Sequence, residues 1–177
     1  IVPDLLGFGR SPWPKISYNV EEHLDALHKT VEIIAPRRNL IVVGHSMGSL
    51  LAVQYANSHR EYVKGLVLLS PPLVTSRKEA QRKIAKEKML EAMMSLDPFI
   101  SSTICHLHEA LGPATLPLFR FFLKGFPKEV IEDSVLHTWN SFDGTFKNIV
   151  LGTDILYELQ MLAEIKKVII LGSHDQY

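Results

Sequence analysis

The sequence has 177 residues, of which 46% are hydrophobic and 21% are charged, so we expect one domain with a sizeable core and exclude disordered and collagen-like chains. Lys plus Arg and Asp plus Glu each number 19, and this lack of net charge argues against a nucleic-acid-binding protein. Cys105 is the single cysteine, which suits a reducing, cytoplasmic location, and no apolar run approaches the roughly 20 residues of a membrane span.

The first elements expected are a strand end, a loop and an amphipathic helix. Ile1 to Pro3 resembles the end of a strand, and a Gly- and Pro-rich loop follows through Pro14. Asn19 can cap a helix, with Glu22 as its capping-box partner, and Pro36 ends that helix. Apolar residues spaced by three and four define one helix face: Leu24, Leu27, Val31 and Ile34.

Strand and helix patterns then alternate, apart from one helical stretch. Leu40–Val43 and Val63–Leu69 are short apolar runs typical of strands buried on both faces, and the pattern between them predicts a helix over Met47–Ser58. Residues 74–151 show helical patterns interrupted by Gly and Pro, without a convincing strand, and begin with a charged helix expected over 77–94. A helix over Ile155–Ile165 and a final buried strand over Val168–Leu171 complete the expected elements.

This order predicts an α/β fold with a mostly parallel sheet flanked by helices. Residues 1–73 and 152–177 are expected to form the core, and residues 74–151 an inserted helical cap. Both ends of the sequence interrupt strand-like patterns, so we interpret it as a segment of a larger domain.

A serine stands between two glycines where the second strand gives way to its helix. The letters "GHSMG" span Gly44 to Gly48 and match Gly-x-Ser-x-Gly in the required strand–turn–helix context. A turn that lifts Ser46 above the strand end is expected to strain its backbone, and Gly44 and Gly48 are expected to let strand and helix approach closely. The N–H of Met47 opens the helix and could donate to an oxyanion formed at Ser46.

Three motifs together resemble the α/β-hydrolase superfamily. They are "GHSMG", the loop "PDLLGFGRS" (Pro3 to Ser11) and the strand-then-turn "VIILGSHD" (Val168 to Asp175). The resemblance implies that Ser46 is the nucleophile, that Asp175 is the acid orienting the base, and that Met47 N–H is one oxyanion donor. It places the catalytic histidine after Tyr177 and a second donor before Ile1, so we expect this segment alone to be inactive. It also implies that sheet edges and one sheet face are left bare.

Several polar residues are expected to have structural roles or to face solvent. Asp4 and Arg10 are expected to organise their loop. His45 is expected to pack under the elbow. His23 and His28 are expected to be solvated.

The sequence contains no recognisable signature for a cofactor or a metal. Pro12 stands where a dinucleotide fingerprint needs its third glycine, so no cofactor is expected. His106 and His108 are two apart on a helix, and no known ligand spacing is present, so no metal is expected. His137, in the cap, is the least excluded substitute for the missing base.

The predicted function is a serine hydrolase that cleaves a carboxylic ester or related acyl bond through an acyl-serine intermediate. The alternative is a non-catalytic ligand-binding protein on the same capped scaffold. The Phe- and Leu-rich stretch 116–126 predicts cap packing and a pocket for an apolar acyl or ester substrate, with Phe119, Phe122 and Phe126 as candidate lining residues. Thioester, amide and carbon–carbon bonds remain open as targets, as does the oligomeric state.

Overall fold

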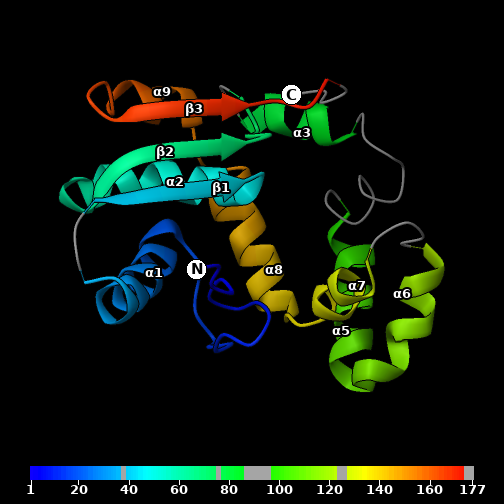
Figure 1. Cartoon of the computed structure of the whole chain (residues 1–177). Coiled ribbons are helices and arrows are strands. Elements are labelled where there is room, and N and C mark those ends of the chain that lie inside the picture. Colours follow the sequence, from blue (N-terminus) through cyan, green and yellow to red (C-terminus); the bar gives the residue numbers. More distant parts are fainter. Residues whose placement is uncertain (37–38, 75–76, 86–96, 123–126, 174–177) are drawn as a thin grey trace.

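The computed structural model describes residues 1–36, 39–74, 77–85, 97–122 and 127–173. Within these residues a parallel sheet has the strand order β1-β2-β3, formed by Leu40–His45, Val63–Leu69 and Lys166–Ile170 (Figure 1). His45 lies opposite Leu69, and Leu69 lies opposite Ile170, so all three strands end at one edge of the sheet. The predicted parallel sheet is confirmed.

Two helices that the sequence predicts are present with nearly the expected limits. Helix α1 spans Val20–Ile34 and begins with the expected capping box, in which Asn19 and Glu22 each accept a backbone N–H of the other at 2.9 Å. Helix α2 spans Met47–Ser58 and lies along β1 and β2 (Figure 1). Helix α2 packs against the sheet because most of its side chains are apolar, and they fill the space between the sheet and the neighbouring helices.

The core forms on the face of the sheet that α2 covers. Its fully buried members come from α2, β2 and the segment between β2 and β3, which shows that distant parts of the chain share one core. They include Leu50, Leu51, Val53, Leu66, Leu68, Ile149, Ile155 and Leu162.

The opposite face of the sheet is largely exposed. Ile41 and Val43 are 67% and 59% exposed, and Val168 and Ile170 on β3 are also exposed. The prediction that β1 and β3 are buried strands is therefore wrong, because the described helices cover one face of the sheet only; the expected bare face is confirmed. Ile1 to Pro3 is not a strand in this structure, and Ile1 and Val2 are exposed.

Helices occupy the described chain between β2 and β3. Helices α5 to α7 gather beyond the edge where the strands end, and α8 leads back from them towards the sheet (Figure 1). Helix α9 is shorter than expected and ends at Gln160. None of the described helices combines the length and the hydropathy needed to cross a bilayer. The helices are α3 (Arg77–Ala85), α5 (Pro98–Leu111), α6 (Leu116–Phe122), α7 (Lys128–Ser134), α8 (Trp139–Thr145) and α9 (Ile155–Gln160), with short helical turns at Arg60–Tyr62, Gly112–Thr115 and Phe146–Val150.

Two histidines of α1 are packed rather than solvated, contrary to expectation. His23 is fully buried, and its Nε2 lies 3.0 Å from Oγ1 of Thr145 in α8. His28 stacks on His59 with ring centroids 3.9 Å apart, and its Nδ1 lies 3.0 Å from the Tyr55 hydroxyl. Both rings lie on the sides of α1 that meet other helices, which the spacing within α1 does not reveal.

The buried His23 predicts a loss of stability in acid. Burial lowers its pKa below the ordinary value of 6.5, and Glu22 opposes this shift only in part. The unfolded chain therefore takes up a proton near the ordinary pKa that the folded protein resists, so the free energy of unfolding falls as the pH drops through that value. In His23→Gln, which retains hydrogen-bonding capacity but does not titrate, this free energy should fall less between about pH 7.5 and about pH 5.5.

Urea denaturation at a series of pH values measures this difference. Ser58→Ala provides the control, since Ser58 is exposed at the end of α2 and carries no titratable group, so this variant should keep the pH dependence of the parent protein. Equal pH slopes for the parent protein and His23→Gln would show that His23 does not contribute.

Candidate active site

Ser46 occupies a sharp turn between β1 and α2. Its backbone has φ 50° and ψ −121°, a region that non-glycine residues rarely enter and that costs about 1–3 kcal/mol. The Ser46 N–H donates to the carbonyl of Leu69 at 2.9 Å, which continues the pairing of β1 with β2 into the turn. The expected backbone strain at Ser46 is confirmed.

The two glycines of the turn have different roles. A Cβ at Gly44 would lie 2.4 Å from the carbonyl oxygen of Gly48, which is too close for any side chain. A Cβ at Gly48 would meet no described atom within 4 Å outside its own helix. The expectation that both glycines allow the close approach therefore holds for Gly44 alone, because the backbone of Gly48 occupies the space where a side chain of Gly44 would be.

Ser49 also holds the turn together, a role that the Gly-x-Ser-x-Gly motif does not predict. It is fully buried, and its hydroxyl donates to the carbonyl of Gly44 at 2.9 Å. This bond joins the first turn of α2 to the last residues of β1. The sequence shows a serine three residues after Ser46, but this spacing does not reveal which group Ser49 bonds to.

The Ser46 side chain is half-buried and makes no capping hydrogen bond to α2. Because α2 begins at Met47, the Met47 N–H belongs to the first turn and has no acceptor within the helix. His45 is exposed and lies on the open face of the sheet, in line with Ile41 and Val43, so the prediction that it packs under the elbow is wrong. The turn thus combines a serine hydroxyl that is not used as a helix cap with an adjacent backbone donor.

The N-terminal loop is organised by Asp4, as expected. The Asp4 carboxylate accepts the N–H of Arg10 at 2.9 Å, and its backbone carbonyl accepts the hydroxyl of Ser11 at 2.7 Å. Arg10 also reaches Asp133 of α7 at 3.8 Å. These contacts give both residues structural roles and bring the loop to the helices beyond β2.

The chain that follows β3 leaves the sheet at the same edge as Ser46. Ile170 ends β3 opposite Leu69, and its carbonyl accepts the N–H of Ser70 at 2.8 Å. Asp175 follows shortly afterwards but lies outside the described residues, as do Phe126 and the side chain of Phe122. Phe119 is half-buried and meets the ring of His108 edge-on, with centroids 6.2 Å apart.

Similar proteins share this architecture. Residues 1–176 match the family described as alpha/beta hydrolase fold. "Probable lysophospholipase BODYGUARD 2" from Arabidopsis thaliana is 31% identical over 168 residues, covering 86% of this chain and 36% of that protein. "Probable lysophospholipase BODYGUARD 3", from the same plant, is 32% identical over 174 residues, covering 85% of this chain and 33% of that protein. The chain thus spans about a third of the length of these curated relatives.

Solved structures show the same fold at low sequence identity. Bromoperoxidase from Bacillus anthracis has a TM-score of 0.63 and 16% identity, over 96% of this chain and 61% of that one. The esterase EaEST from Exiguobacterium antarcticum has a TM-score of 0.56 and 19% identity, over 94% of this chain and 60% of that one.

Proposed function

The chain belongs to the α/β-hydrolase fold family, and from this premise we propose that it is a serine hydrolase that cleaves a carboxylic ester or related acyl bond through an acyl-serine intermediate. The observation that carries the proposal is the conformation of Ser46. A strained φ of 50° at a half-buried serine, placed between a strand and a helix, presents the hydroxyl at the sheet edge instead of using it as a cap.

The proposed reaction uses the turn as follows. The Ser46 hydroxyl attacks the carbonyl carbon of the substrate, while a base removes its proton and the Met47 N–H donates to the developing oxyanion. The carbon–oxygen bond to the leaving alcohol then breaks, and the protonated base returns the proton to the alkoxide. Water attacks the acyl-serine by the same path and releases the acid. Asp175 is proposed to orient the base.

We further propose a long-chain acyl ester as the substrate. Curated relatives are named probable lysophospholipases, and these are the relatives with about 30% identity over most of the chain. Large apolar side chains are exposed on α5 and α6, where an acyl chain could bury them: Phe99, Leu107, Leu111 and Phe121. Burial of each methylene contributes about 0.8 kcal/mol, so such a surface favours long chains over short ones.

A series of p-nitrophenyl esters tests the substrate class on the full-length protein. We expect kcat/KM to rise by up to about fourfold for each added methylene from the acetate to the octanoate, and 1-palmitoyl lysophosphatidylcholine to be hydrolysed. A flat or falling series would contradict an apolar acyl site. Binding of palmitate without hydrolysis of any ester would instead favour the non-catalytic ligand-binding protein.

A further inference from the structure

Three potential metal ligands meet among the helices beyond β2. Cys105 and His108 are three residues apart on one side of α5, and His137 comes from the segment between α7 and α8. One ligand atom from each residue lies within 4.8 Å of those of the other two. No metal site is expected from the sequence, because His106 and His108 are two apart on a helix and no known ligand spacing is present. The cluster found here instead joins His108 to His137, which is 29 residues away.

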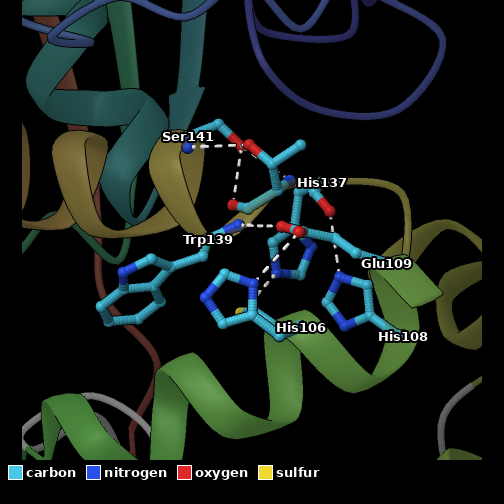
Figure 2. A network of polar contacts seen from close by, with 8 residues as sticks. His106, His108, Glu109, His137, Trp139 and Ser141 are labelled. Carbon is cyan, nitrogen blue, oxygen red and sulfur yellow. Dashed lines mark hydrogen bonds and ion pairs between the residues drawn. The ribbon is translucent and has the colours of Figure 1, made fainter.

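The hydrogen bonding of His108 leaves one ring nitrogen available. Its Nε2 lies 2.9 Å from the backbone carbonyl oxygen of His137, and because a carbonyl can only accept, Nε2 carries the proton (Figure 2). The neutral ring therefore has a lone pair on Nδ1. This atom is buried without a hydrogen-bond partner among the described residues, and the whole residue is only 3% exposed. A buried acceptor without a donor is costly, whereas metal-binding histidines commonly donate the other ring N–H to a carbonyl in this way.

The spacing of the other two ligands suits a tetrahedral metal ion. Sγ of Cys105 lies 3.5 Å from Nε2 of His137. In tetrahedral Zn²⁺ coordination, with Zn–S and Zn–N bonds of about 2.3 and 2.0 Å, sulfur and nitrogen ligands are about 3.5 Å apart. Thiolate and imidazole donors select Zn²⁺ over Mg²⁺ and Ca²⁺, which prefer oxygen.

Glu109 fixes the segment that carries His137. Its carboxylate accepts the N–H of Trp139 at 2.5 Å, and its other oxygen lies 3.2 Å from Nδ1 of His106 (Figure 2). Phe8 forms a β-bridge to His137, which ties the same segment to the N-terminal loop. The hydrogen bond from Trp139 and the bridge to Phe8 hold His137 against α5, and Glu109 supplies a negative charge near the cluster.

A reactive thiol is the competing interpretation of a cysteine beside a histidine. Cys105 is only 4% exposed, whereas reactive cysteines are partly accessible to their substrates, so the pair does not resemble an activated dyad.

We propose that Cys105, His108 and His137 form a zinc site that joins α5 to the segment before α8. Cys105 Sγ, His108 Nδ1 and His137 Nε2 coordinate the ion, and a water takes the fourth position. On binding, the thiol proton of Cys105 is released to the buffer, and no oxidation or reduction takes place. The site is separate from the proposed hydrolase mechanism, which does not use the ion.

Co²⁺ and Zn²⁺ titrations of the full-length protein test this site. We expect one equivalent of Co²⁺ to give a thiolate-to-cobalt charge-transfer band that Zn²⁺ displaces, and Zn²⁺ to raise the Tm. Cys105→Ser should abolish the band, and His108→Gln should weaken Zn²⁺ binding by about 100-fold or more. His108→Gln is informative because the glutamine amide can keep the hydrogen bond to the His137 carbonyl while the Nδ1 lone pair is lost.

His106→Gln is the matched control, since His106 lies on the same helix but is exposed and paired with Glu109. It should bind Zn²⁺ as tightly as the parent protein. Zinc affinity unchanged in Cys105→Ser and His108→Gln, or equal stabilisation by Mg²⁺, would overturn the proposal. If the variants do not fold, the parent protein decides the question: Zn²⁺ should slow alkylation of Cys105 in mild denaturant by at least about tenfold, and an unchanged rate would overturn the site.

Discussion

Replacement of Ser46 by alanine is expected to lower kcat for ester hydrolysis by about 10⁴- to 10⁶-fold. The change removes the oxygen that forms the acyl intermediate, while the backbone donors of the turn remain. The fold should be preserved, because the Ser46 side chain makes no capping hydrogen bond to α2 and its replacement by alanine removes no contact of the core. Steady-state kinetics on the full-length protein, with thermal unfolding to verify the fold, provide the measurement.

Ser58→Ala is the control for this experiment. Ser58 is exposed at the last residue of the same helix, and its replacement should leave kcat unchanged. A Ser46→Ala protein that retains more than about a tenth of the parent kcat would mean that another group is the nucleophile.

Replacement of Gly44 by alanine is expected to destabilise the fold by about 3 kcal/mol or more. The new Cβ would lie 2.4 Å from the backbone oxygen of Gly48, and neither strand β1 nor helix α2 has a flexible side chain there that could move aside. The turn could relieve the contact only by separating the strand from the helix, which would also displace Ser46. Chemical denaturation of the two proteins gives the difference in the free energy of unfolding.

Gly48→Ala is the matched substitution within the same motif. Its Cβ meets open space, and alanine is favoured over glycine in a helix by up to about 1 kcal/mol, so this variant should be as stable as the parent protein or more stable. A similar loss of stability in both variants would show that the close approach at Gly44 does not determine the turn.

Local patterns were enough to predict the elements around Ser46. The apolar run of β2 ends in Ser70, Pro71 and Pro72, and the limits of α2 match the expected range because apolar residues dominate that segment. Burial was less predictable. A β-branched run such as 40–43 is compatible with one covered face or two, and only the packing of α2 on a single face decides that Ile41 and Val43 are exposed.

The candidate site divides in the same way. Ser46, Met47 and Gly44 are local to one turn, so the motif predicts their arrangement, and the strained φ of Ser46 confirms its geometry. The positions of His23 and His108, in contrast, depend on partners far along the chain. His23 meets Thr145 at a separation of 122 residues, and His108 meets His137 at a separation of 29, so no helical periodicity could have shown that these rings are buried. The role of Asp175 stays a prediction.

Covalent labelling with a fluorophosphonate tests the central proposal most directly. The reagent phosphonylates an activated serine hydroxyl and leaves an ordinary surface serine unmodified, so peptide mapping identifies the nucleophile itself. We predict that the full-length protein is modified at Ser46 with a stoichiometry near one and that Ser46→Ala is not labelled. Labelling at a different serine, or a folded protein that hydrolyses esters without any modification of Ser46, would contradict the proposed acyl-serine mechanism.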